Sequence, residues 1–328
     1  MANAVETPSQ NNLMTEGSIV KSLLLFALPL IFGNLLQQLY NTADSIIVGN
    51  FVGANALAAV GSSGSPIYLL IGFSQGLAVG AGVVVSQFLG AKDHREAQEA
   101  VHTSLAIAVI MGLLLTVGGI ACGRALLVAM NTPAEVLGDA VTYIRIYFGG
   151  VLFSVVYNMT AGILNAAGNS RRSLIYLAWA SVTNIVLDLV FIVIFRMGVA
   201  GAAVGTVLAR VAEFVMIIAY MLVWEKKIRF RLHMLLWPSG GLARDLVRYG
   251  LPVMLNELLW SVAISMHSVI LGHMSSDIVA ANSICNVMFQ MATSIILGVS
   301  NASAVLVGML VGRGDYPYAR ACVNKLIQ

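Results

Sequence analysis

The sequence predicts an all-α polytopic membrane protein built from two parallel six-helix repeats, the second of them incomplete. Three observations favour this fold class. The chain has 328 residues, 59% hydrophobic and 10% charged, whereas a soluble domain is typically about 25% charged. Apolar stretches long enough to cross a bilayer recur along it. Finally, segments beginning near residues 27 and 250 share a pattern of proline, glycine and polar positions.

Eight apolar stretches have the length of about 20 residues that a membrane helix needs. They cover roughly residues 19–48, 56–88, 100–122, 139–165, 173–195, 199–223, 249–272 and 279–311, and a ninth begins near Ala319. We therefore expect a first six-helix lobe over 18–224, a basic cytoplasmic linker over 225–247, and the start of a second lobe over 248–328. Residues 1–17 are polar and do not resemble a secretory signal, so we expect a cytoplasmic tail there.

The distribution of basic residues predicts the orientation. Of the 18 Lys and Arg residues, 14 lie at the N-terminus or in every second loop between the predicted spans. Loops rich in Lys and Arg stay in the cytoplasm. We therefore expect a multi-pass protein of the cell inner (plasma) membrane with a cytoplasmic N-terminus and odd-numbered spans that run outward.

An internal repeat relates the first and seventh spans. The segment "ALPLIFGNLLQQLYNTADSIIVGN" (27–50) matches "GLPVMLNELLWSVAISMHSVILGH" (250–273), and "SQFLGAKDHREA" (86–97) matches "GMLVGRGDYPYA" (308–319). Six spans per repeat is an even number, so both copies have the same orientation, as in parallel-repeat transporters. The second copy has two full spans and the following loop. A copy equal to the first would need about four more helices, on the order of 100 to 130 residues.

Polar residues at one depth of the first lobe form the candidate site. Asp44 lies near the outer end of the first span, and Asp188 lies about eight residues from the outer end of the fifth. Asn184 is one helical turn from Asp188 on the same face, and Thr206 has a similar depth on the sixth span. A buried carboxylate costs about 3 kcal/mol to insert. Such oxygen ligands suit Na⁺ or proton exchange, although an interhelical hydrogen-bonding role remains an alternative.

Other ionisable residues inside the spans have simpler explanations. Arg210 and Glu213 are three residues apart on one helix, and an internal ion pair explains both. For Glu257, on the seventh span, a cavity role and a polar interhelical contact are equally compatible with the sequence. The three cysteines lie far apart, without disulfide or zinc spacing. We find no nucleophile–base grouping or phosphate loop, so we expect neither an enzyme nor a cofactor or nucleic-acid partner.

Several motifs together resemble the multidrug and toxic compound extrusion (MATE) family of antiporters. They are "ALPLIFGNLLQQLYNTADSIIVGNFVGANALAAVG", "LNAAGNSRRS", "SVTNIVLDLVFI" and "GVAGAAVGTVLAR". The resemblance implies twelve helices in two lobes, alternating access, and export of small organic cations, drugs or toxic metabolites in exchange for H⁺ or Na⁺. It also implies a cation site, for H⁺ or Na⁺, at Asp44, Asn184, Asp188 and Thr206, and a second-lobe site that includes Glu257. We expect a monomer in the lipid bilayer.

Two other functions are compatible with such a chain. A flippase for lipid-linked oligosaccharides or polysaccharides, from the same superfamily, would line its cavity with several Arg or Lys residues that bind pyrophosphate. The first lobe offers only Arg145 and Arg210 within its helices, which disfavours this function. A non-transporting membrane scaffold would tolerate replacement of the buried carboxylates.

Overall fold

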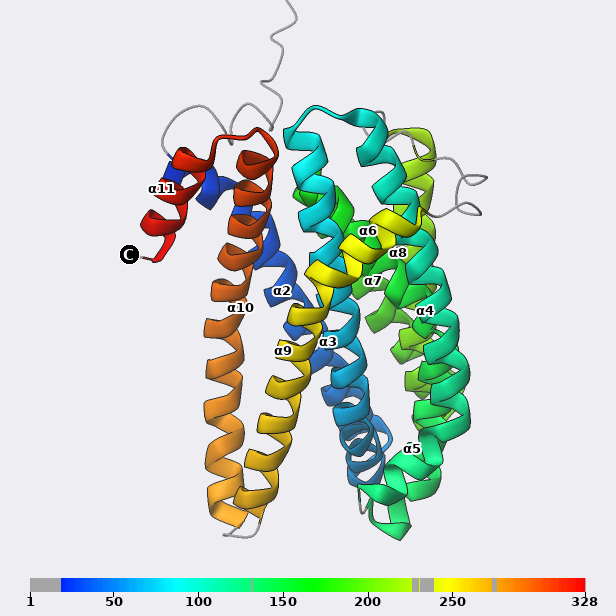
Figure 1. The fold of residues 1–328 in the computed structure, drawn as a ribbon. Helices are drawn as coiled ribbons and strands as arrows, with labels where there is room; N and C mark the ends of the chain where they lie inside the picture. The colour runs from blue at the N-terminus through cyan, green and yellow to red at the C-terminus, as the bar shows by residue number, and fades with distance from the viewer. Residues whose placement is uncertain (1–18, 131, 226–229, 231–238, 273–275, 328) are drawn as a thin grey trace, which may run out of the picture.

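The computed structural model describes residues 19–130, 132–225, 230, 239–272 and 276–327, and Figure 1 shows its arrangement. The predicted tail, 1–17, and residues 226–229 and 231–238 of the predicted linker lie outside this range. The described part of the chain is helical and contains no strand. Every predicted span coincides with a helix or a pair of helices.

The first lobe contains α2 (Ile19–Phe51), α3 (Ala54–Gly90), α4 (His94–Ala129), α5 (Ala134–Gly149), α6 (Val151–Ala166), α7 (Ser170–Asp188), the π-helix η1 (Leu189–Ile194) and α8 (Gly198–Val223). The second contains α9 (Gly240–Gly272), α10 (Ser276–Gly312) and α11 (Tyr316–Ile327). Within the described residues, five helical segments are long and apolar enough to cross a membrane, and the α5–α6 pair supplies a sixth if it counts as one span.

The predicted fourth span is a broken helix. The α5 and α6 helices meet at Gly150 with a bend of 49°. A Cβ atom at Gly150 would lie 2.7 Å from Cγ1 of Val207 on α8, so glycine is needed for α8 to approach the bend. The sequence prediction of one continuous helix over 139–165 missed this break, because apolar periodicity continues across it.

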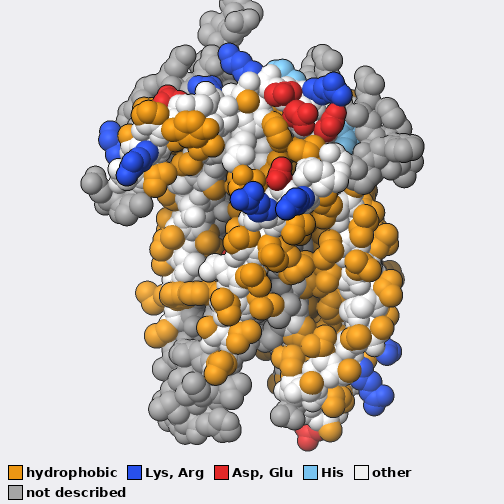
Figure 2. Space-filling view, viewed as in Figure 1, with side chains coloured by type: hydrophobic (Ala, Val, Ile, Leu, Met, Phe, Trp, Pro, Cys, Tyr) orange, Lys and Arg blue, Asp and Glu red, His pale blue; other side chains and the backbone are white. Residues whose placement is uncertain are grey.

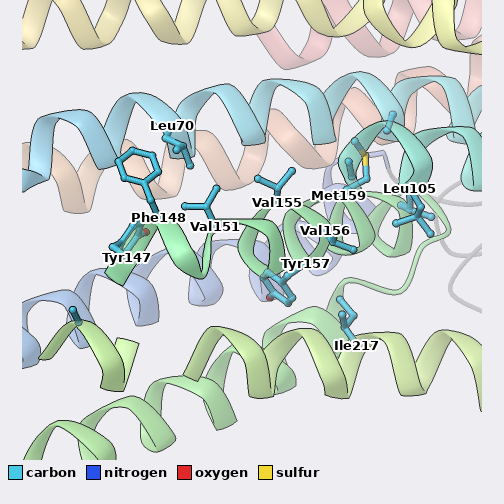
Figure 3. Close-up of a cluster of buried hydrophobic side chains, with 14 of the residues drawn as sticks. Leu70, Leu105, Tyr147, Phe148, Val151, Val155, Val156, Tyr157, Met159 and Ile217 are labelled. Atoms are coloured by element: carbon cyan, nitrogen blue, oxygen red, sulfur yellow. The ribbon is translucent and has the colours of Figure 1, made fainter. Parts of the chain in front are cut away.

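The main hydrophobic core lies inside the first lobe, around α6 (Figure 3). Val151 and Val155 point toward α3, whereas Tyr157 lies on the opposite side of α6. Met159 on α6 and Ile217 on α8 are almost completely buried, with exposed fractions of 1% and 0%. Apolar side chains also cover much of the face shown in Figure 2, and many large apolar side chains are exposed, as expected for a protein surrounded by lipid.

On the face shown in Figure 2, most Lys and Arg side chains lie toward the upper end of the molecule. We call it the basic end. The α3 and α10 helices terminate there at Gly90 and Gly312. Asp93 then caps α4 by accepting a hydrogen bond from the backbone of Glu96, 3.1 Å away. Asp315, its equivalent in the repeat, accepts one from Tyr318 at 3.2 Å.

The contacts between the lobes obey the symmetry of the repeat. The α2 and α9 helices are both 33 residues long, and α3 and α10 are both 37. A Cβ atom at Gly76 of α3 would lie 2.8 Å from the backbone nitrogen of Met254 on α9. At the equivalent crossing, a Cβ atom at Gly298 of α10 would lie 3.0 Å from the nitrogen of Ile31 on α2. The two crossings correspond residue by residue, which confirms the parallel repeat.

The same reciprocity appears at the basic end. A Cβ atom at Gly90 would lie 2.9 Å from the carbonyl carbon of Met309, and one at Gly312 would lie 2.7 Å from that of Gln87. Gly90 corresponds to Gly312 in the sequence repeat, and Gln87 corresponds to Met309. Such exchanged contacts place a pseudo-two-fold axis between α3 and α10.

Candidate functional site

The four polar residues predicted in the first lobe lie on three neighbouring helices. Asp44 comes from α2, Asn184 and Asp188 come from α7, and Thr206 comes from α8. We call these four residues the acid site. Asp188 is completely buried and Asn184 is 2% exposed, whereas Asp44 is half-buried. The structure therefore brings together the residues that the depth argument grouped.

Direct contacts link the members of the acid site. The carboxyl groups of Asp44 and Asp188 are close enough to interact. Nδ2 of Asn184 donates a long hydrogen bond of 3.5 Å to Oγ1 of Thr206. These contacts join α2 to α7 and α7 to α8.

The acid site leaves several buried oxygens without a hydrogen-bond donor. Within the described residues, both carboxylate oxygens of Asp188, Oδ1 of Asp44 and Oδ1 of Asn184 have none. Buried polar atoms in native proteins are nearly always paired, because an unpaired one is unfavourable. A proton or a small hard cation would satisfy these oxygens, and the donor set of carboxylate, amide and hydroxyl oxygens fits Na⁺.

Local backbone features position Asp188. The α-helical part of the fifth span ends at this residue, and the π-helix η1 begins directly after it. Single π-turns are frequent at functional sites. On the facing helix, a Cβ atom at Gly205 would collide with Oδ1 of Asp188. The absence of a side chain at Gly205 therefore lets α8 approach the carboxylate closely.

Arg210 and Glu213 form the ion pair that their spacing predicted. Nη1 of Arg210 donates to Oε2 of Glu213 at 2.8 Å, and the Glu213 side chain is fully buried. Nη2 of Arg210 also donates to the hydroxyl of Tyr40, and its guanidinium carbon lies 5.4 Å from the centre of the Tyr40 ring. The ion pair is thus connected to α2 through Tyr40, which lies one helical turn before Asp44.

A small cavity adjoins the acid site. Asn184 and Thr206 line it, together with Tyr40 and Arg210. Arg210 and Leu177 also line a second, larger space, which we call the central cavity. These two residues therefore stand between the acid site and the central cavity.

The central cavity lies between the lobes. Helices α2, α3, α6, α7 and α8 of the first lobe line it, and α10 contributes from the second. The space between the lining atoms amounts to about 970 Å³, including the part open to the outside. Six of the lining residues carry amide side chains, namely Asn34, Gln37, Gln75, Asn158, Asn165 and Asn301.

Glu257 is not part of either group. It lies on α9, and a Cβ atom at Gly72 of α3 would be 3.2 Å from its Cβ atom. It does not contribute to the described lining of the two cavities. Its repeat equivalent, Asn34, occupies the corresponding place between α2 and α10 and donates to the carbonyl oxygen of Ser294 at 3.2 Å.

Comparisons with known proteins identify the family. Residues 29–190 match the family model described as MatE. A probable multidrug resistance protein, YpnP of Bacillus subtilis, is 31% identical over 246 residues, which are 75% of this chain and 54% of that protein. A second from the same organism, YoeA, is 27% identical over 94% of this chain and 69% of its own length. A solved MATE transporter in an outward-facing conformation is 26% identical, with a TM-score of 0.89 over 98% of this chain and 71% of its own.

This chain belongs to the MATE family.

The chain spans only about half the length of YpnP, 54%. In this MATE chain, sequence reasoning missed three residues of the acid-site region: Tyr40, Ser181 and Gly205. Tyr40 is four residues before Asp44 and Ser181 is three before Asn184, so helical spacing places each beside a predicted residue. That signal was present in the sequence. The role of Gly205 had no such signal, because it depends on how α8 packs against α7.

Proposed function

We propose that this MATE chain functions in a cation-coupled antiporter that exports small organic solutes by alternating access. The acid site would hold the coupling ion, H⁺ or Na⁺, and the central cavity would hold the solute. The observation that carries the proposal is a group of three buried carboxylate oxygens, both of Asp188 and Oδ1 of Asp44, that lack hydrogen-bond donors among the described residues. Residues with a purely structural role would be expected to form hydrogen bonds with each other.

The energetics of such an exchange are feasible. An inward monovalent cation that moves through about 150 mV releases roughly 3.5 kcal/mol. Expulsion of a neutral solute against a hundredfold gradient requires about 2.7 kcal/mol. The ion and the solute are coupled if each binds one conformation of the protein better than the other, since a ligand shifts an equilibrium only by its differential affinity.

We further propose that the basic end faces the cytoplasm of a cell with this protein in its plasma membrane. The concentration of Lys and Arg at that end supports the orientation (Figure 2). Because the lobes are in contact there, through Gly90 and Gly312, the conformation would be one closed to the cytoplasm. The resemblance to the solved outward-facing transporter is in line with this.

Coupled efflux from reconstituted vesicles tests the proposal. We expect an imposed H⁺ or Na⁺ gradient to accelerate the efflux of a trapped fluorescent organic solute. Asp188→Asn removes the buried charge with little change of shape, and we expect it to reduce the accelerated component by about tenfold or more, because a neutral amide holds a cation poorly. Asp139→Asn on α5, where the side chain is exposed, is the matched control. Wild-type acceleration in Asp188→Asn would refute the role of the acid site.

The central cavity also bears on the flippase alternative. A carrier of pyrophosphate-linked lipids needs several cationic groups to bind the phosphates. Among the described residues that line the central cavity, Arg210 is the single basic one, and Glu213 already pairs with it. The lining therefore favours the export of small solutes.

A further inference from the structure

The first part of α9 carries two arginine side chains on a face that points away from the protein. Leu242 and Leu246 of this segment are buried in the main hydrophobic core of the first lobe. Arg244 and Arg248 are also four residues apart and therefore share a face of the helix, and both are exposed. We call them the arginine pair. The segment is amphipathic, with an apolar face on the first lobe and two cationic groups on the opposite face.

The arginine pair lies well below the end of the neighbouring helix. The backbone nitrogen of Ser239, directly before α9, donates to Oγ1 of Thr103 on α4 at 3.1 Å. Thr103 is nine residues after His94, where α4 begins, so this contact is about 14 Å along that helix. From there α9, yellow in Figure 1, runs away from the basic end. The arginine pair therefore lies beside the apolar part of α4 and not beyond its end.

The internal repeat shows that this surface faces outward from a lobe. Arg248 and Leu251 correspond to Leu25 and Leu28 of α2. Those two leucines are 51% and 44% exposed, although all the predicted spans of the first lobe are described. Leu251 is likewise 45% exposed. Because the first copy has an apolar side chain where the second has Arg248, the repeat fold itself does not require a charge at this position.

Neither arginine has an anionic partner within the described residues. The salt bridges in that part of the chain lie on α4 and α8. Asp245, on the same segment of α9, is half-buried and pairs with neither arginine. The sequence 226–238, which precedes α9, contains Lys and Arg but neither Asp nor Glu. A charged side chain beside lipid normally finds an opposite charge, and here a group from outside the chain would supply it.

We propose that the arginine pair binds the phosphate of an anionic phospholipid headgroup from the leaflet at the basic end. Guanidinium groups match phosphate oxygens with two parallel hydrogen bonds, and Val247 and Leu251, both exposed, are placed to contact the acyl chains. A zwitterionic lipid also offers a phosphate, but its own ammonium group cancels the charge that attracts Arg. This lipid site does not depend on the proposed transport function.

Lipid binding to the purified chain in detergent tests the proposal. Native mass spectrometry compares dioleoyl phosphatidylglycerol with dioleoyl phosphatidylcholine, which have the same acyl chains. We expect the dissociation constant of the first bound phosphatidylglycerol to be lower by roughly tenfold or more. Arg244→Gln with Arg248→Gln should reduce this preference to about threefold or less, and the variant should fold because both side chains are exposed. Equal binding of the two lipids by the wild type, or a full preference in the variant, would overturn the proposal.

A matched control separates this site from the general charge of the basic end. Arg313→Gln with Arg320→Gln removes the same charge from exposed positions outside α9, and we expect it to keep the preference for phosphatidylglycerol. An equal loss in both double variants would contradict a specific site. Arg244→Lys with Arg248→Lys keeps the charge, so its preference should exceed that of the glutamine variant. A loss as complete as with glutamine would contradict the electrostatic basis.

Inorganic phosphate distinguishes a lipid from a soluble anion. It has the same charged oxygens but no acyl chains. We expect an excess of inorganic phosphate to leave phosphatidylglycerol bound to the wild type, because Val247 and Leu251 add apolar contacts that it cannot make. Displacement of the lipid by inorganic phosphate would show that the arginine pair is a site for soluble anions and would overturn the lipid assignment.

Discussion

Asp188 owes its position to the residue that faces it. Gly205 of α8 leaves room for the carboxylate, and a Cβ atom there would collide with Oδ1 of Asp188. We expect Gly205→Ala to displace the carboxylate and to weaken cation-driven efflux severalfold, with destabilisation of about 1 to 3 kcal/mol from overpacking. Gly118→Ala is the control, because nothing lies within 4 Å of a Cβ atom at that exposed position. Unchanged coupled efflux in Gly205→Ala would show that the close approach of α8 is unimportant.

The sequence predicted which polar residues of the first lobe lie near one another, and their role in ion binding stays a prediction. Asp44, Asn184, Asp188 and Thr206 were grouped from depth in the membrane and helical spacing, and the structure places them together. The partners of Arg210 show which contacts the sequence can predict and which it cannot. Its pairing with Glu213 follows from spacing on one helix, whereas its contact with Tyr40 joins helices far apart in sequence and depends on their packing.

On α3, three glycines lie where this helix crosses α9. Gly72, Gly76 and Gly80 face Glu257, Met254 and Gly250 of α9. Small residues at four-residue spacing allow two helix backbones to approach closely, and α3 and α9 make such an approach here. The identity of the partner helix was not predictable from the glycines themselves, because the spacing is equally compatible with any neighbour.

The crossing of α3 and α9 gives a prediction for stability. Gly76→Ala introduces a methyl group 2.8 Å from the backbone nitrogen of Met254. A backbone atom cannot move aside as easily as the end of a flexible side chain. We expect a loss of about 1 to 3 kcal/mol, measured as a lower midpoint of thermal unfolding in detergent. Gly64→Ala on the same helix has nothing within 4 Å and serves as the control. Equal midpoints for the two variants would contradict the packing account.

For the molecule as a whole, the pseudo-two-fold axis passes near a pair of equivalent residues. Ser86 and Gly308 align in the sequence repeat, and a Cβ atom at Gly308 would lie 3.2 Å from the Cβ atom of Ser86. The sequence predicted the parallel repeat. It did not predict that these two residues meet, since alignment of the copies gives their equivalence and not their distance.

Joining these residues should lock the lobes together at the basic end. In a background with Cys122, Cys285 and Cys322 changed to Ser, we expect Ser86→Cys with Gly308→Cys to form a disulfide, because the Cβ separation is near the range for one. Alternating access requires this contact to open, so oxidation should abolish transport and reduction should restore it. Ser86→Cys alone is the control. Complete cross-linking with undiminished transport would exclude opening at this end.

The most direct measurement follows cation uptake and dye efflux in the same vesicles, for the wild type and Asp188→Asn. We predict that the wild-type protein takes up H⁺ or Na⁺ in proportion to the dye it releases. Asp188→Asn should lose this coupled uptake and still bind the dye, because Asp188 does not line the central cavity. If Asp188→Asn takes up the cation in the wild-type proportion, the acid site is not where the coupling ion binds.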